Sequence, residues 1–178
     1  VFGLVGSEMC IRDRPHIAER LTLSDQKLID PVVDITNYII LELGQPLHAF
    51  DRDKLNGDIS VRLAKKDESI TLLDDQTLNL DASCLVISDE KEAVAFAGVM
   101  GGKDSSVTSS TSSIFLESAY FKPSVIRGKA RKFGFQTEAS LRFERGVDYT
   151  IQEFALNRAT YLLNQTIGGE IGLSLIHI

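Results

Sequence analysis

A histidine inside an apolar stretch is the first residue of this sequence whose type could do chemistry. His48 stands between Leu47 and Ala49 in LELGQPLHAFD, just past a Gly-Gln-Pro break. An imidazole there either packs in the core with its proton hydrogen-bonded, or faces a cleft and exchanges protons or holds a water. The local pattern alone favours a packed core histidine.

A carboxylate lies in a comparable setting. Glu117 is part of IFLESA, and strand alternation places it on the same face as Phe115 and Ala119, opposite Leu116. A carboxylate flanked by apolar residues generally needs a partner. A glutamate on a solvated edge strand is an equally good interpretation.

Two further positions could line the same cleft. Asn37 lies off the apolar stripe of its predicted helix, near Val33 and Ile40. Gly98 opens the glycine-rich segment AGVMGG, which is more typical of a tight turn than of a phosphate cradle. Together with His48 and Glu117, these residues define the candidate site that the residue types suggest.

The elements that must position these residues follow from hydrophobic period and turn residues. Asp30-Pro31 begins a helix that ends at Gly44, with Val32, Ile35, Ile39 and Leu43 as its stripe. Further expected elements are strands at 59–64, 84–88, 93–98 and 114–121, a hairpin around Asp74-Asp75, a polar loop at 105–113, and helices at 123–134 and 150–164. The last helix has Ile151, Phe154, Ala155, Arg158, Ala159 and Leu162 at helical spacing. Helices flanking a run of strands predict an α+β fold.

Both ends of the chain look foreign to the domain. LVGSEMCIRD (4–13) and LSLIHI (173–178) resemble translations of one sequencing adapter read in opposite senses. We therefore expect residues 1–14 and 173–178 to be adapter-derived tails that take no part in the core. Residues 15–172 then form a single domain, cut at both ends from something longer.

Composition limits the classes of function. The net charge is −6 with or without the tails, which argues against nucleic-acid binding through overall charge. The basic stretch IRGKARK (126–132) could touch a phosphate backbone locally, but a solvated helix face is the favoured interpretation. Residues 15–172 contain two histidines and a single cysteine, Cys84. So few ligand side chains make a metal site improbable. A lone cysteine and no apolar run of ~20 residues fit a cytoplasmic protein without a membrane span.

Four stretches in the same order carry a family resemblance: PVVDITNYIILELGQPLHAFDRDKL, AGVMGG, IFLESAYFKPSVIRGKARKFG and TEASLRFERGVD. They resemble the B3/4 editing domain at the centre of bacterial phenylalanyl-tRNA synthetase β subunits. The resemblance implies a layered β/β/α sandwich. It also implies hydrolysis of tyrosine wrongly esterified to tRNA(Phe), within an α2β2 enzyme. ATP and magnesium would belong to the α subunit, and no cofactor to this domain.

The family's site residues carry over by position. The resemblance places His48, Asn37 and Thr137 near the ester and its water, as catalytic residues. It places Glu117 and the amide of Gly98 at the tyrosine hydroxyl. Ala139, a small residue of TEAS, is added to the substrate-binding set. Lys27 stands where the family pattern has an arginine, so the contact of that arginine does not carry over to this sequence.

Two other functions remain open on the sequence alone. One is a non-catalytic module that binds tRNA or packs subunits together. The other is a freestanding editing protein of the B3/4 type. The set of His48, Asn37, Glu117 and Thr137 favours catalysis over a purely structural module.

Overall fold

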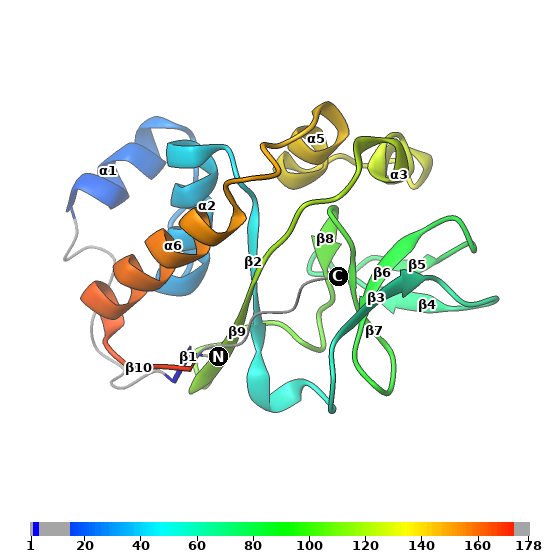
Figure 1. Ribbon diagram of the computed structural model, residues 1–178, viewed down its shortest axis with the longest axis horizontal. Coiled ribbons are helices and arrows are strands. Elements are labelled where there is room, and N and C mark those ends of the chain that lie inside the picture. The colour runs from blue at the N-terminus through cyan, green and yellow to red at the C-terminus, as the bar shows by residue number, and fades with distance from the viewer. Residues whose placement is uncertain (1, 4–14, 173–178) are drawn as a thin grey trace. The chain divides into compact units, whose positions relative to one another are not determined.

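The computed structural model describes residues 2–3 and 15–172, and it divides into two compact units (Figure 1). Unit 1 contains the described residues among 1–53, 107–119 and 150–178. Unit 2 contains residues 54–106 and 120–149. The chain therefore leaves unit 1 and returns to it twice. Helices and strands occur together throughout, which confirms the predicted α+β class.

Unit 1 is one antiparallel sheet with helices against it. Its helices are α1 (Pro15–Leu23), α2 (Pro31–Leu43) and α6 (Gln152–Ile167), and its strands are β1 (Phe2–Gly3), β2 (Leu47–Asp51), β9 (Ser113–Ser118) and β10 (Glu170–Ile171). The sheet order is β10-β1-β9-β2. Leu47, Ala49 and Ile114 from the sheet share one apolar core with the buried faces of the three helices.

The ends of α2 are fixed by the residues that predicted them. The Asp30 carboxylate accepts a hydrogen bond from Val32 N at 2.9 Å, and Pro31 occupies the first turn. At the other end, Gly44 adopts a left-handed conformation with φ of 72° and donates its N–H to Ile40 O. Because a left-handed residue stops the helix there, the chain turns directly into β2.

Unit 2 contains a second sheet, a hairpin and short helices. The sheet has the order β3-β6-β7-β8, the hairpin pairs β4 with β5, and a 3-10 turn, η2 (Arg52–Lys54), leads into the unit. The bounds are β3 (Ser60–Leu63), β4 (Ser69–Thr71), β5 (Thr77–Asn79), β6 (Leu85–Ser88), β7 (Ala93–Phe96), β8 (Met100–Gly101), α3 (Pro123–Ile126), α4 (Lys129–Lys132) and α5 (Glu138–Arg145). The predicted strands and the Asp74-Asp75 hairpin are thereby confirmed.

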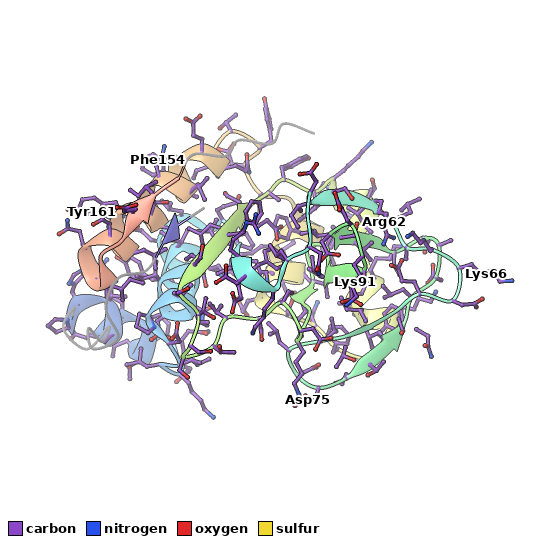
Figure 2. The ribbon with its side chains drawn as sticks, turned by 90° about the horizontal axis from the view of Figure 1, so that it is seen from below. Arg62, Lys66, Asp75, Lys91, Phe154 and Tyr161 are labelled. Carbon is purple, nitrogen blue, oxygen red and sulfur yellow. The ribbon has the colours of Figure 1, made fainter. Side chains whose placement is uncertain are left out.

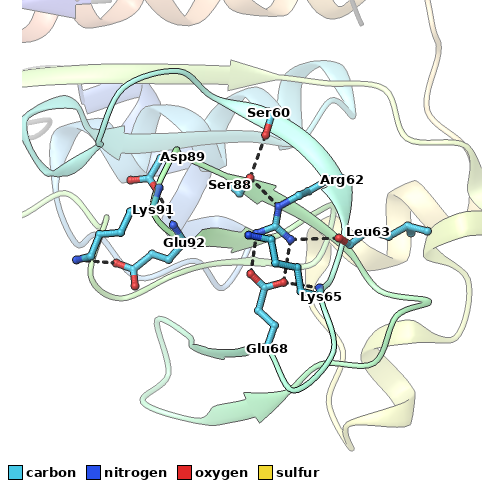
Figure 3. Close-up of polar contacts among 9 residues, drawn as sticks. All are labelled: Ser60, Arg62, Leu63, Lys65, Glu68, Ser88, Asp89, Lys91 and Glu92. Carbon is cyan, nitrogen blue, oxygen red and sulfur yellow. Dashed lines mark hydrogen bonds and ion pairs between the residues drawn. The ribbon is translucent and has the colours of Figure 1, made fainter.

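A polar network braces the first strands of unit 2 (Figure 3). Arg62 on β3 donates to both oxygens of Glu68, at 2.7 and 2.8 Å, and to Ser88 Oγ on β6 at 3.1 Å. Glu68 also accepts from Lys65 N, and the Arg62 guanidinium holds the pKa of the Glu68 carboxyl below its usual value. One arginine thus ties the β3–β6 pair to the turn that leads into β4.

Several predictions about the elements were wrong. The expected helix over 123–134 is two short helices, because Gly128 takes a left-handed conformation with φ of 77° between them. Phe154, placed on the apolar stripe of α6, is 60% exposed. Strand β2 and the helices α1 and α5 were not predicted. Strand β9 ends at Ser118, three residues before the predicted end.

The N-terminal tail also departs from expectation. Phe2 and Gly3 form β1, where Phe2 pairs with Ile114 of β9 and with Ile171 of β10. A sheet edge offers free N–H and C=O groups that any extended backbone can satisfy, so such pairing needs no particular side chains. Residues 4–14 and 173–178 lie outside the described residues, and their adapter origin stays a prediction. None of the described helices has the length and apolar character needed to cross a membrane.

Candidate active site

The two residues that first suggested chemistry face each other on unit 1. Strands β2 and β9 pair antiparallel with His48 directly opposite Glu117. Directly opposite residues in such a pair have Cβ atoms roughly 4.5–5.5 Å apart and project from the same face of the sheet. The ladder therefore brings the imidazole and the carboxylate together, although their sequence positions are far apart.

The face that carries them is the one turned away from the helices. Leu47, Ala49 and Leu116 alternate onto the opposite face and pack against the α1–α2–α6 core. On the His48 side, the His48 ring meets Phe50 edge-on, with ring centroids 4.5 Å apart. Phe50 in turn lies 6.3 Å from the Phe115 ring, so the pair of titratable groups stands beside aromatic rings. The predicted grouping of Glu117 with Phe115 and against Leu116 is confirmed.

Burial acts on the two groups in opposite ways. It lowers the pKa of His48 to about 4, because surrounding protein disfavours the imidazolium. It raises the pKa of Glu117 to about 7, because the same loss of water disfavours the carboxylate. Both side chains still reach the surface in part. At neutral pH the free site therefore holds a neutral imidazole and a carboxyl group close to half ionised.

Neither His48 nor Glu117 is hydrogen-bonded through its side chain to the part of the chain that the structure describes. Nε2 of His48 is buried and has no hydrogen-bond partner within the described residues. The Glu117 carboxylate makes no hydrogen bond or ion pair to any part of the chain that the structure describes. Since burying polar groups without partners is costly, these two side chains mark a place where a ligand would supply the missing bonds. This is the observation that distinguishes the site from a packed core.

Asn37 lies on the helix beside this sheet. It is on α2, partly exposed, on the side of the helix that also carries Val33 and Ile40, as expected. Its amide makes no hydrogen bond within residues 2–3 and 15–172. The structure records no contact between Asn37 and His48, so a shared cavity stays a prediction. Lys27, at the position of the missing arginine, is exposed just before this helix.

The other three predicted residues belong to unit 2. Gly98 has a left-handed conformation with φ of 68°, and a Cβ there would lie 3.0 Å from Ile126 Cδ1 and 3.1 Å from Phe121 Cδ2. Glycine is thus required by both the backbone and its neighbours. The Gly98 N–H donates to no residue in the described part of the chain, which leaves it available to a ligand.

Thr137 has a structural task that the sequence did not reveal. It is the N-cap of α5, where Oγ1 accepts from Ser140 N at 3.0 Å and Ser140 Oγ accepts from Thr137 N. The same Oγ1 donates its proton to Val99 O at 2.8 Å. Thr137 therefore connects α5 to Val99, the residue after Gly98. Ala139, in the first turn of α5, is partly exposed.

The basic stretch 126–132 is bonded to partners within unit 2. Lys132 bonds the Asp81 carboxylate, Lys129 donates to Ser83 Oγ at 2.7 Å, and Arg131 lies 3.4 Å from Glu144. The favoured interpretation, a solvated face, thus missed its acidic neighbours, which come from distant parts of the sequence. No group of three or more His, Cys, Asp or Glu side chains in the described ranges could hold a metal ion.

Gln45 is a residue of this region that sequence reasoning overlooked. Its side chain is fully buried and bonds Ala119 O just beyond β9 and the side chain of Gln152 at the start of α6. The GQP break was interpreted only as a helix stop. A polar residue beside a helix end gives no sign in the sequence that its amide will be enclosed.

Comparison with known proteins gives a consistent result. The family model of the B3/4 domain matches residues 2–168. The chain is 58% identical over 156 residues to the phenylalanine–tRNA ligase β subunit of Idiomarina loihiensis, covering 88% of this chain and 20% of that protein. The same subunit of Colwellia psychrerythraea is 53% identical over 156 residues, covering 88% and 19%. The chain spans about a fifth of the length of the curated relatives it matches.

Proposed function

Because this chain belongs to the B3/4 domain family, we propose that it is the editing domain of a phenylalanine–tRNA ligase β subunit and hydrolyses tyrosine wrongly attached to tRNA(Phe). In this proposal the complete enzyme pairs the β subunit with an α subunit as α2β2 in the cytoplasm. ATP and magnesium act at the α subunit. Water attacks the ester carbonyl, the bond to the ribose oxygen breaks, and the products are free tyrosine and uncharged tRNA.

A phenylalanine enzyme needs such a second site for a physical reason. A hydrophobic pocket that accepts phenylalanine rejects an analogue with one added hydroxyl only by roughly 100-fold. A site built to hydrogen-bond that hydroxyl reverses the preference. Phenylalanine would leave its polar groups unpaired, which costs about 1–3 kcal/mol per group.

The unpaired Glu117 carboxylate on an aromatic face is the observation that carries the proposal. A phenol donates well to a carboxylate, and charge-assisted bonds of this kind contribute about 1.5–3 kcal/mol. This corresponds to roughly ten- to 150-fold in preference for tyrosine over phenylalanine. Gly98, with its unused N–H, and Ala139 stay proposed substrate contacts.

The histidine is proposed to hold the water or the ester rather than to take a proton. A general base works best when its pKa is near the working pH, whereas burial lowers the pKa of His48 to about 4. A neutral imidazole can still donate one hydrogen bond and accept another. Asn37, with an unused amide, is proposed to assist in the same way.

The test uses the full-length enzyme that carries this segment. Glu117→Ala should lower hydrolysis of tyrosyl-tRNA(Phe) by roughly ten- to 150-fold, and leave hydrolysis of phenylalanyl-tRNA(Phe) low or slightly raised. Glu42→Ala is the matched control, since Glu42 bonds Arg158 on the helix layer of the same unit. Equal loss on both substrates would show that Glu117 serves the chemistry or the fold, and would refute its role in specificity.

One observation favours a second function, the packing of this domain against another part of a larger enzyme. Phe154 and Tyr161 both project from α6 (Figure 2). They are 60% and 56% exposed. The Arg158 guanidinium lies 6.0 Å from the centroid of the Tyr161 ring. Exposed aromatic side chains on one helix face are typical of an interaction surface. The Phe154→Ser/Tyr161→Ser variant should then weaken assembly of the full-length enzyme on size-exclusion chromatography, while unchanged assembly would exclude this role.

A further inference from the structure

We propose that Gln45 is a positioning residue whose buried amide sets the register of β2 against β9 and so keeps His48 opposite Glu117. The register claim concerns the fold of unit 1 alone. Its consequence for hydrolysis rests on the proposed function. The two can therefore fail separately.

Gln45 fastens three segments of unit 1 that are distant in sequence. Its side chain is 0% exposed, and Nε2 donates to Pro46 O at 3.0 Å and to Ala119 O at 2.9 Å. Its Oε1 accepts from Gln152 Nε2 at 3.1 Å. Gln152 O in turn accepts from Ser118 Oγ, the last residue of β9, at 2.8 Å. Because both protons of the buried amide and one lone pair of its oxygen are used, its orientation is fixed.

The Gln45 amide acts just beyond the end of the backbone ladder. Leu47 and Ser118 form the last pair, and the backbones of Pro46 and Ala119 do not bond each other. The Gln45 side chain donates to Ala119 O at this point. It therefore continues the attachment of β2 to β9 where the backbone ladder stops.

The register of β2 depends on such an attachment because β2 has a single neighbour among the strands that the structure describes. It lies at the edge of its sheet and pairs only with β9 among the described strands. A slip of one residue would turn every side chain of β2 to the other face of the sheet. His48 would then enter the helix-packed core, and Leu47 or Ala49 would face Glu117.

The opposite end of the β2–β9 pair supplies a matched control. Asp51 pairs with Ile114, and its carboxylate accepts from Thr111 Oγ1 at 2.7 Å. Thr111→Val removes this side-chain bond just as Gln45→Met removes those of Gln45. This bond joins two segments only, whereas Gln45 also connects β2 to α6 through Gln152, so we expect the register to depend less on Thr111.

The experiment measures register and activity in parallel. In the 178-residue chain, NMR contacts between backbone protons of His48 and Glu117 report the register. In the full-length enzyme, Gln45→Met should lower kcat for tyrosyl-tRNA(Phe) hydrolysis on the order of 10- to 100-fold. KM should change far less. Thr111→Val should keep both the contacts and kcat.

Three outcomes would overturn the inference: kcat unchanged in Gln45→Met, kcat lowered with the His48–Glu117 contacts intact, or equal loss of kcat in Thr111→Val. If Gln45→Met does not fold, Gln45→Asn carries the same comparison, since it keeps the amide but is one methylene too short to reach Ala119 O. If the unmodified enzyme releases no tyrosine while the contacts vanish in Gln45→Met and persist in Thr111→Val, the proposed function fails and the register role stands.

Discussion

A carboxyl group whose pKa is about 7 is half ionised at neutral pH, so Glu117 responds to small changes in its surroundings. Its opposite neighbour does not share this property, because the imidazole of His48 stays neutral down to a pH of about 4. A phenol bonds the ionised carboxylate more strongly than the protonated one. At the scale of single residues, the selectivity of the site should therefore depend on pH through Glu117 alone.

We expect the preference for tyrosyl- over phenylalanyl-tRNA(Phe) to rise with pH. Between pH 6 and pH 8 the ionised fraction of a group with a pKa of about 7 grows from about one tenth to about nine tenths, so the preference should grow by up to roughly ten-fold. The ratio of kcat/KM for the two substrates at each pH measures this, after the rate without enzyme is subtracted, and it cancels pH effects that act equally on both esters. Glu117→Gln should give a flat ratio, and a sloping one in that variant would assign the titration to another group.

At the scale of elements, Thr137 connects the Gly98 turn to α5, and its hydroxyl holds both. Removing that hydroxyl should cost stability, by about 1–2 kcal/mol for the lost cap. We expect Thr137→Val to show this loss in urea unfolding, and Thr137→Ser to remain close to the unmodified protein. If instead Thr137→Val is as stable as the original but loses hydrolysis, Thr137 acts on the substrate, as the family resemblance implies.

Helices and turns whose ends carry characteristic capping or turn residues could be predicted from the sequence. Elements fixed by contacts between segments that are distant in the sequence could not. Asp30-Pro31 and Gly44 define α2 by themselves, and Asp75 with its left-handed φ of 68° closes the predicted hairpin. LHAFD was not recognised as a strand, because its extended form is stabilised by pairing with the distant strand β9. Gly128 was present in the predicted helix over 123–134, yet its interrupting effect was missed.

Some features of the candidate site could likewise be predicted from the sequence, and others could not. The alternation of IFLESA correctly placed Glu117, since a strand's period is local. The pairing of Glu117 with His48 could not follow from periodicity, because register is set by contacts between separate segments. The structural use of Thr137 was equally hidden, since its acceptor, Val99 O, belongs to a turn far back in the sequence.

At the scale of the whole molecule, His48 and Glu117 give stability an opposite dependence on pH. The unfolded chain returns Glu117 to its ordinary pKa of 4.5, so from there to about 7 the folded protein holds more protons and stability falls as pH rises. His48 has an ordinary pKa of 6.5 in the unfolded chain and a lower one, about 4, in the folded protein. Between these two pH values the unfolded chain holds more protons, so stability rises with pH.

We therefore expect Glu117→Gln to become more stable, relative to the unmodified chain, as pH increases. The gain between pH 4 and pH 8 should be about 1–3 kcal/mol, allowing for the partial exposure of the side chain. Urea unfolding at the two pH values measures it, with Glu170→Gln, at an exposed position, as the control. A gain that is the same at both pH values would mean that the Glu117 carboxyl titrates normally.

The route of the chain through unit 1 has a consequence for how the protein is made. Strand β2 leaves the ribosome early, but its only partner among the described strands, β9, follows after the whole of residues 54–106, and α6 emerges later still. Pairings between such distant segments form slowly, because a long loop must close first. The backbone edge of β2 must wait without its strand partner while residues 54–106 emerge, although α2, made earlier, can already cover its apolar face. A nascent chain halted before Thr150 would lack α6 and remain prone to aggregation.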